Sequence, residues 1–245
     1  MPGERLLLLG GTGDARALAK ALVGKGYTVV SSLAGVTRAP LLPVGEVRVG
    51  GFGGAKGLAA YVRAEEIALV CDATHPFAVK ISRNAAEGAR AAGVPYVRFE
   101  RPAWQPGADD QWTEVSDLEA AAAMIAPGAR VFLTTGRKEL EAFRQRGDVK
   151  VVARMIETAD HGAPASWRIV EGRPPFSRES EMRLMREEAI DVLVTKNAGG
   201  SREKLDAAAA LGIPVVMVHR PPKPDAPVAS SVPEMVALVE AALAG

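Results

Sequence analysis

The sequence of 245 residues has one cysteine, no long apolar run and almost no net charge. A single cysteine, Cys71, excludes an internal disulfide framework and a thiolate-rich metal cluster, so we expect no metal site. Apolar runs stay below the roughly 18 residues of a membrane span, and the run at 6–9 is too short for the core of a signal peptide. We therefore expect a cytoplasmic protein without a membrane partner.

The overall charge also excludes one class of partner. The chain carries 30 Lys and Arg against 29 Asp and Glu, a net charge of +1. A protein dedicated to nucleic acid usually has a strongly basic face, so we expect no nucleic-acid partner. The sum hides a difference along the chain, because residues 1–100 carry 12 basic and 8 acidic residues and residues 101–245 carry 18 and 21. This difference indicates two structural units.

Several catalytic motifs are missing from the sequence. Tyr27, Tyr61 and Tyr96 are not followed by a lysine four residues later, which excludes the Tyr/Lys proton donor of short-chain dehydrogenases. There is no G-x-S-x-G nucleophile elbow, no P-loop and no H-E-x-x-H metal motif. We interpret Cys71, inside a predicted strand, as a small buried apolar residue and not as a nucleophile. Any reaction is therefore expected to take its chemistry from a cofactor.

Short apolar runs alternate with alanine-rich amphipathic segments along the chain, a pattern typical of α/β proteins with parallel sheets. In the segment 14–23, apolar residues recur at the spacing of one helix face. The predicted strands span 5–9, 27–32, 46–49, 67–72, 94–99, 130–134, 149–155, 190–195 and 214–218. The predicted helices span 14–23, 57–64, 79–92, 116–125, 138–146, 177–188, 201–211 and 233–244.

These elements fall into two doubly wound halves of four or five parallel strands each. We predict a first domain at 1–100, a linker at 101–112, a second domain at 113–220, and a proline-rich segment with a last helix at 221–245. The prolines and glycine at the start of the second half mark the linker. Ser116 and Glu119 have capping-box spacing at the start of the helix 116–125. The last helix is a candidate to pack back on the first domain.

A glycine-bearing turn joins the first predicted strand to the first predicted helix. Glycines permit a sharp turn and the close approach of a diphosphate, and the helix N-terminus offers free N–H groups and a partial positive charge. The spacing is a variant of G-x-G-x-x-G, because Arg16 takes the third glycine position counted from Gly11. The candidate cofactor-binding residues here are Gly10, Gly11, Thr12, Asp14 and Ala15. The alternative is a tight turn in which Asp14 is only a favourable first-turn charge.

The end of the second predicted strand bears on the choice of cofactor. NAD-specific loops usually have an acid about 20 residues after the glycines, which accepts from the ribose hydroxyls. Here the candidate residues are instead Ser32, Leu33, Ala34, Gly35 and Arg38. Hydroxyl groups and an arginine favour a 2′-phosphate and therefore NADP. The alternative is that Arg38 is a solvated loop residue.

A further cluster follows the strand 67–72. Small polar groups at the carboxyl end of a strand face the ligand crevice of an open sheet, so Asp72, Thr74 and His75 are candidates for the cofactor site. His75 has the donors to reach a ribose, a carboxylate or a carbonyl. The alternative is a local cap that Pro76 fixes. His161 and His219 form no metal-ligand spacing with His75.

Two glycine-bearing turns with cationic neighbours follow strands of the second half, at 134–138 and 195–200, and Arg220 ends a third strand there. Helix N-termini of this kind are places for anions, so we expect a shared anionic ligand. The alternative is a set of ordinary strand-to-helix turns with solvated Lys and Arg side chains. The candidate substrate-binding residues are Thr135, Gly136, Arg137, Lys196, Asn197, Gly199, Gly200, Lys204 and Arg220.

Taken in order, these motifs resemble the precorrin-6A reductase family of cobalamin biosynthesis. The resemblance spans nearly the whole chain and rests on the residues 10–12, 15–16, 32–35, 72–78, 101–104, 133–137, 175–176, 195–197, 199–200, 204–205 and 220–221. The family commonly has an arginine where this chain has Val36, and the nearby Arg38 is a substitute for it. It also has a serine where this chain has Ala198.

The resemblance implies two Rossmann-like domains with parallel sheets and a cleft between them. It implies NADPH in the first domain and a small-molecule tetrapyrrole partner on the side of the second. The reaction implied is the reduction of precorrin-6A to precorrin-6B, with hydride transfer to a double bond of the macrocycle. Transfer of intermediates to neighbouring pathway enzymes is a related expectation, and the sequence does not give the oligomeric state.

The carboxylates of a precorrin suit the cations of the second half. We assign no catalytic residue, and we expect the proton that accompanies the hydride to come from solvent or from the macrocycle. Two alternative functions remain open at this point. One is an NADP-dependent reductase of another anionic substrate, and the other is a non-catalytic NADP-sensing protein.

Overall fold

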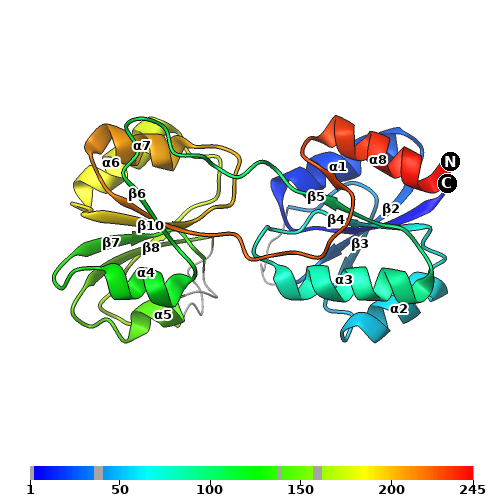
Figure 1. The fold of residues 1–245 in the computed structure, drawn as a ribbon, viewed down its shortest axis with the longest axis horizontal. Helices are drawn as coiled ribbons and strands as arrows, with labels where there is room; N and C mark the ends of the chain where they lie inside the picture. Colours follow the sequence, from blue (N-terminus) through cyan, green and yellow to red (C-terminus); the bar gives the residue numbers. More distant parts are fainter. Residues whose placement is uncertain (1–2, 36–40, 137–139, 157–161, 245) are drawn as a thin grey trace. The chain divides into compact units, whose positions relative to one another are not determined.

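The computed structural model describes residues 3–35, 41–136, 140–156 and 162–244. The chain forms two compact units, of which the first comprises Met1–Pro102 and Pro221–Gly245 and the second Ala103–Arg220. Each unit is a parallel β-sheet with helices on both of its faces (Figure 1). The predicted α/β fold with parallel sheets is therefore confirmed. The predicted strand number is wrong, because each sheet contains six described strands instead of four or five.

The sheet of the first unit has the strand order β3-β2-β1-β4-β5-β12, and all its strands are parallel. Helices α1 and α8 cover one face and α2 and α3 cover the other (Figure 1). The strands are β1 (Arg5–Leu9), β2 (Thr28–Leu33), β3 (Glu46–Val49), β4 (Leu69–Asp72), β5 (Tyr96–Phe99) and β12 (Val228–Ala229). The helices are α1 (Gly13–Gly24), α2 (Ala55–Ala64), α3 (Val79–Ala92) and α8 (Val232–Ala244).

Strand β1 shows why this unit forms a two-sided core. Successive side chains of a strand point to opposite faces, and a central parallel strand is covered on both. Leu6 and Leu8 pack in the cluster with α1 and α8, while Leu7 and Leu9 pack in the cluster with α2 and α3. All four leucines are 0–1% exposed. Strand β1 is therefore buried on both faces, and this explains its uninterrupted run of leucines.

The sheet of the second unit has the order β6-β11-β10-β7-β8-β9, again with all strands parallel. Its strands are β6 (Trp112–Val115), β7 (Arg130–Leu133), β8 (Lys150–Met155), β9 (Arg168–Glu171), β10 (Val192–Lys196) and β11 (Val215–Val218). Its helices are α4 (Leu118–Met124), α5 (Glu141–Arg144), α6 (Arg178–Glu187) and α7 (Glu203–Leu211). Helices α6 and α7 lie on one face of the sheet, and α4 and α5 lie on the other (Figure 1).

The last 25 residues return to the first unit and complete it. Strand β12 pairs with β5 in parallel, through Val228 opposite Arg98 and Ala229 opposite Phe99. Helix α8, red in Figure 1, lies beside the blue helix α1. Its residues Met235, Val236 and Val239 are buried in the same cluster as the residues of α1. The first unit is thus built from two pieces of chain that are far apart in the sequence.

Three strands escaped prediction because their sequences lack an apolar run. Strand β6 has one buried residue, β9 has none, and β12 has two residues in all. Each of them lies at an edge of its sheet, where one side meets solvent and polar residues are tolerated. Short and partly exposed edge strands are therefore harder to recognise than the buried central ones.

Two local expectations need correction. Ser116 is not the helix cap, because Asp117 takes that position in α4 and its Oδ1 atom accepts from Ala120 N at 2.7 Å. Helix α5 spans only Glu141–Arg144 of the predicted 138–146, and residues 137–139 lie outside the described residues. The remaining predicted strands and helices agree with the structure to within two residues at each end.

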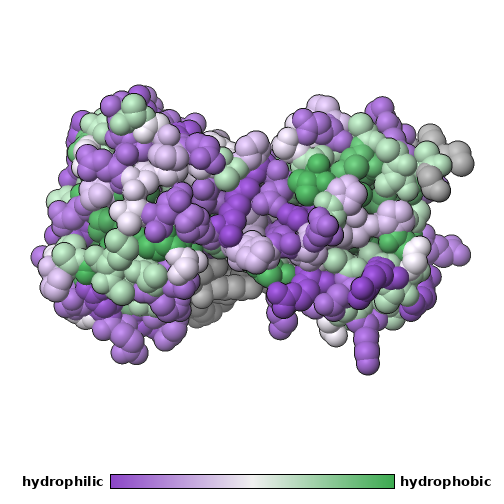
Figure 2. Space-filling model, viewed as in Figure 1, coloured by the Kyte–Doolittle hydropathy of each residue, from purple (hydrophilic) through white to green (hydrophobic). Residues whose placement is uncertain are grey.

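The surfaces of both units are mixed. Figure 2 shows hydrophilic residues over most of the visible face of each unit, with apolar residues in smaller groups between them. In the part of the chain that the structure describes, we find no helix with the length and apolar character needed to cross a membrane.

Gly88 offers a test of how α3 packs against α2. A Cβ atom at this position would lie 2.7 Å from Leu58 Cδ2 and 2.9 Å from Ala55 O, so the two helices must move apart. We expect Gly88→Ala to lower the free energy of unfolding of the first unit by about 1–3 kcal/mol. The matched control is Gly24→Ala in the last turn of α1, where a Cβ atom meets nothing within 4 Å. That change should be neutral or stabilising in urea unfolding followed by circular dichroism.

Candidate functional site

The glycine turn lies at the point of the first sheet where the chain changes direction. From β1 the chain proceeds outward through β2 and β3, and it then returns to the other side of β1 at β4. In open parallel sheets, ligands bind in the crevice at the carboxyl ends of the strands at such a switch point. Here the loop after β1 contacts the loop after β4, because Thr12 Oγ1 donates to Ala73 O at 3.1 Å and Ala73 N donates to Leu9 O at 2.9 Å.

The glycine turn combines an unusual backbone with open space. Gly11 has a φ of +110°, and a Cβ atom there would meet nothing within 4 Å. A Cβ atom on Gly10 would lie 3.4 Å from Ala15 Cβ, so strand and helix approach closely. Thr12 is the N-cap of α1, and its Oγ1 atom accepts from Ala15 N at 3.0 Å. The candidate residues between 10 and 15 therefore form a single turn. The Thr12 hydroxyl stabilises this turn by hydrogen bonds, and the absence of a side chain at Gly11 leaves the backbone accessible.

The second strand ends beside this turn. Gly10 N donates to Ser32 O at 3.0 Å, which brings the candidate residues Ser32, Leu33, Ala34 and Gly35 to the same edge of the sheet. Gly35 has a φ of +72°, and a Cβ atom there would lie 2.9 Å from Val49 Cγ1, so this position requires glycine. Arg38 lies outside the described residues.

Arg48 is a polar residue at this edge that the sequence did not single out. The parallel register of β2 and β3 places it opposite Ser32, and its Nη1 atom donates to Ser32 Oγ at 2.8 Å. The guanidinium lies over the ring of Phe52, 3.8 Å from the centroid, and donates to Gly50 O at 3.0 Å. The available signal was the arginine within the predicted strand 46–49, because parallel pairing can place that strand beside the strand end that favours a 2′-phosphate.

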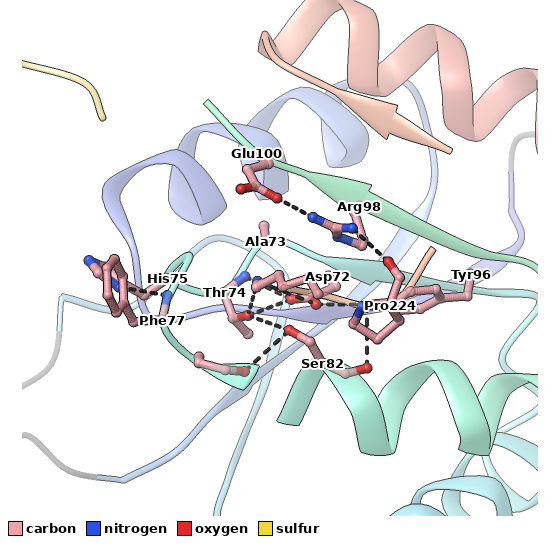
Figure 3. Close-up of polar contacts among 12 residues, drawn as sticks. Asp72, Ala73, Thr74, His75, Phe77, Ser82, Tyr96, Arg98, Glu100 and Pro224 are labelled. Atoms are coloured by element: carbon pink, nitrogen blue, oxygen red, sulfur yellow. Dashed lines mark hydrogen bonds and ion pairs between the residues drawn. The ribbon is translucent and has the colours of Figure 1, made fainter. Parts of the chain in front are cut away.

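Asp72, the last residue of β4, is the centre of a buried polar network (Figure 3). Its side chain is 0% exposed, and its Oδ1 atom accepts from the backbone N of Thr74 at 3.0 Å and from Thr74 Oγ1 at 2.6 Å. Its Oδ2 atom accepts from Tyr96 OH at 2.8 Å and lies 3.7 Å from Lys223 Nζ. Lys223 also donates to Thr74 Oγ1 at 3.2 Å. The network joins β4, β5 and the returning C-terminal segment.

The charges in this network depend on one another. Burial by itself would raise the pKa of the Asp72 carboxyl, but the Lys223 ammonium and hydrogen bonds from Ser82 and Thr74 hold that pKa below its ordinary value. Burial lowers the pKa of Lys223, and the Asp72 carboxylate opposes that change. Burial and the neighbouring Asp72 raise the pKa of Tyr96. Asp72 is therefore stabilised as a carboxylate, and its hydrogen bonds with Thr74 fix the start of the loop after β4.

His75 follows this network at the carboxyl end of β4. Its Nδ1 atom accepts from Phe77 N at 3.3 Å (Figure 3). Pro76, beside it in the sequence, is buried. This is the local cap that was the alternative interpretation. With Nδ1 as acceptor, the neutral ring carries its proton on Nε2. A contact between that atom and a ligand remains a prediction.

The second sheet has its own switch point, between β7 and β10. Thr134 N donates to Val194 O at 3.1 Å, so the turns that follow these two strands lie side by side. Thr135 is 4% exposed, and its Oγ1 atom has no hydrogen-bond partner among the described residues. Gly136 has a φ of +99°. Arg137 lies outside the described residues.

Trp104 anchors the turn after β10. Asn197 Oδ1 accepts from Trp104 N at 2.8 Å, Asn197 Nδ2 donates to Trp104 O at 3.1 Å, and Trp104 Nε1 donates to Gly200 O at 2.8 Å. Sequence reasoning placed Trp104 in a linker, but the side chain is 7% exposed and packs in the core of the second unit. The Asn197 amide is therefore a structural bridge.

Three of the candidate cations, Lys196, Lys204 and Arg220, belong to or lie beside this anchored turn. Lys204 Nζ lies over the ring of Trp104, 4.9 Å from the centroid. Arg220 Nε donates to Asn197 O at 2.7 Å. Lys196 ends β10 and is 9% exposed, and Gly199 and Gly200 have φ values of +70° and +84°. Within the described residues no group of His, Cys, Asp and Glu is arranged to hold a metal ion.

The pair of Asp72 and Lys223 predicts a large effect on stability. Lys223→Met leaves a buried carboxylate without its cation, which should cost the first unit roughly 3–5 kcal/mol of unfolding free energy. The double change Asp72→Asn with Lys223→Met leaves no unpaired charge and should recover much of that loss. Circular dichroism measures the effect in urea, and tryptophan fluorescence is the control because Trp104, Trp112 and Trp167 all lie in the second unit.

The same pair predicts a dependence on pH. The folded-state pKa of Asp72 is below its ordinary value of 3.8, so its ionised form contributes stability above that pH and loses it as the pH falls through the folded-state value. The difference in unfolding free energy between the wild type and Asp72→Asn should therefore narrow as the pH is lowered from 7 to below 3.8. A constant difference would contradict this assignment.

Known proteins match this chain along nearly its full length. The sequence profile described as "Precorrin-6x reductase CbiJ/CobK" matches residues 5–240. A precorrin-6A reductase of Rhodococcus erythropolis is 50% identical over 226 residues, 91% of each chain. One of Mycobacterium tuberculosis (strain ATCC 25618 / H37Rv) is 49% identical over 221 residues, 89% of each chain.

The solved structure of "CobK precorrin-6A reductase" matches with a TM-score of 0.92 and 38% identity, covering 98% of this chain and 97% of that one. The profile, the sequence relatives and this structure all match along nearly the full length of the chain. The chain therefore belongs to the precorrin-6x reductase family.

Proposed function

We propose that this protein reduces precorrin-6A to precorrin-6B in cobalamin biosynthesis, with NADPH as the source of hydride. The observation that carries the proposal is the open glycine turn at the switch point of the first sheet. It occurs in a chain that matches named precorrin-6A reductases along nearly its full length. NADPH, when bound, supplies the hydride that adds to a double bond of the macrocycle. The protein binds and orients the two ligands.

The residues of the first unit fit a dinucleotide. A diphosphate needs a backbone that it can approach and N–H groups that point toward it. Gly11 provides the approach, and the first turn of α1 follows it directly. We assign Gly10, Gly11, Ala15, Thr74 and His75 to the cofactor site, with Asp72 fixing the loop that carries the last two. Ser32, Leu33, Ala34, Gly35 and Arg38 are the proposed surroundings of the adenosine 2′-phosphate.

The second unit has the charges that a precorrin needs. Acetate and propionate carboxylates are recognised by cations and by hydroxyl or backbone donors. We assign Lys196, Lys204 and Arg220 to the carboxylates, with Arg137 as a further cation assigned from the sequence. The buried hydroxyl of Thr135, which lacks a partner among the described residues, suits a ligand acceptor. Gly136, Gly199 and Gly200 open the turns to the macrocycle.

We assign the accompanying proton to solvent or to the macrocycle. Tyr96 is a poor donor, because burial raises its pKa and its hydroxyl already donates to Asp72. Cys71 is 0% exposed, and burial raises its pKa as well. Both groups are therefore unsuited to deliver a proton at neutral pH.

The direct test is an assay with purified protein, precorrin-6A and NADPH. We expect loss of NADPH absorbance at about 340 nm only when both ligands are present, together with formation of a dihydro-product. NADPH binding without any oxidation would favour the NADP-sensing alternative. Oxidation with a different anionic substrate, and none with precorrin-6A, would favour the alternative reductase.

Gly11 provides a sharper test of the cofactor site. Gly11→Ala places a methyl group in the space that the diphosphate would use, and we expect NADPH to bind about tenfold or more weakly. The matched control is Gly3→Ala at the amino end of β1, because Gly3 has a similar φ of +102° and equally open surroundings. Gly3→Ala carries the same backbone strain and should leave NADPH affinity within about twofold. Equal affinity for the wild type and Gly11→Ala would remove this turn from the site.

A further inference from the structure

An ion pair spans the switch point of the first sheet. Arg101 lies just beyond β5, and its Nη2 atom lies 3.0 Å from Oδ2 of Asp14, the second residue of α1. Strand β4 separates β5 from β1 in the sheet, so the Arg101 side chain reaches across the carboxyl end of β4. The two side chains are 28% and 34% exposed, so water reaches both groups.

The pair borders a small pocket at this edge. Its lining includes Thr12, Asp14, Thr74 and Arg101. These residues come from the glycine turn, from the loop after β4 and from the end of β5. They belong to the region where the proposed function places a dinucleotide. The carboxylate of Asp14 therefore occupies the first helical turn that a diphosphate would approach.

The first turn of α1 bears one anion and would receive another. The Asp14 carboxylate and a diphosphate both bind arginine, so the two would compete for Arg101. Because water reaches the Asp14 carboxylate, its direct repulsion of the diphosphate is screened, and the competition for Arg101 is the larger effect. An arginine binds phosphate oxygens through two parallel N–H groups, whereas a partly exposed ion pair with a carboxylate contributes only about 0–1 kcal/mol.

We propose that Arg101 binds the diphosphate of the cofactor and that Asp14 holds Arg101 in place until the cofactor displaces it. The proposal rests on the proposed NADPH-dependent function. Asp14 is then a positioning residue of the free protein, and Arg101 is a cofactor-binding residue. The competing explanation is a fixed brace, in which the ion pair simply ties the end of β5 to α1 in every state.

The two explanations differ in a double-mutant cycle on NADPH affinity. The proteins are the wild type, Asp14→Asn, Arg101→Met and the double variant, with Kd measured by NADPH fluorescence at low and high salt. We expect Arg101→Met to weaken binding about 10- to 50-fold, because a charged phosphate contact is lost. We expect Asp14→Asn to tighten binding about 2- to 5-fold, because Arg101 no longer has to leave a partner.

The cycle also separates partner exchange from a general effect of charge. If Asp14 acts through Arg101, Asp14→Asn should tighten binding by less than about 1.5-fold once Arg101→Met is present. A general effect of charge would give the same tightening in both backgrounds, and it would fade at high salt. Lys20→Met, which removes an exposed positive charge from α1, is the charge-matched control and should leave Kd within about twofold.

The outcomes decide between the explanations. Partner exchange is supported if Asp14→Asn and Arg101→Met shift the Kd for NADPH in opposite directions and the effect of Asp14→Asn depends on Arg101. Shifts in the same direction, no shifts, or fully additive shifts overturn it. Weaker binding of precorrin-6A by Arg101→Met with unchanged NADPH affinity also overturns it. If the wild type itself does not bind NADPH, the proposed function fails, and this result is distinct from a failure of the inference about Arg101.

Discussion

The first unit depends on the burial of one carboxylate. Asp72 is fully buried at the end of a central strand, and a charge in such a place needs a cation and hydrogen bonds. Tyr96 and Thr74 supply hydrogen bonds, while the cation is Lys223, 149 residues along the chain from Thr74. The sheet edge and the apolar side of α1 are completed by the same returning segment. The first unit therefore reaches its final packing only after the chain has passed through the whole second unit.

Parallel sheets explain how residues far apart in sequence gather at the two proposed sites. The carboxyl ends of neighbouring strands meet at one edge, so turns that follow different strands become neighbours. In the first unit this brings the glycine turn, the end of β2 and the loop after β4 together. In the second it brings together the turns after β7, β10 and β11. The proposed cofactor site and the proposed anion site therefore each lie at the carboxyl edge of one parallel sheet.

Several residues predicted to bind ligands act within the protein itself. Thr12 caps a helix, Asn197 bridges to Trp104, and Asp72 organises its own loop. Small polar residues at strand ends can have either of two roles. They contact a ligand directly, or they stabilise the turn that binds the ligand. The sequence pattern is the same in both cases, so it predicts the location of a site better than the role of each side chain. Partners such as Trp104 and Lys223 come from distant segments, and no local pattern indicates them.

The sequence by itself determined the α/β class, the central strands and most helices. In these elements the positions of the apolar residues show directly which side chains are buried. It also determined where the glycine turns lie and, through the order of its motifs, the resemblance to a reductase family. Only the tertiary structure decided the edge strands β6, β9 and β12, the return of α8 to α1, and the pairing of Asp72 with Lys223 and of Asp14 with Arg101. The physical reason is that these features depend on contacts between segments far apart in the sequence. Such segments form their ion pairs and hydrogen bonds with each other only once the sheets have formed.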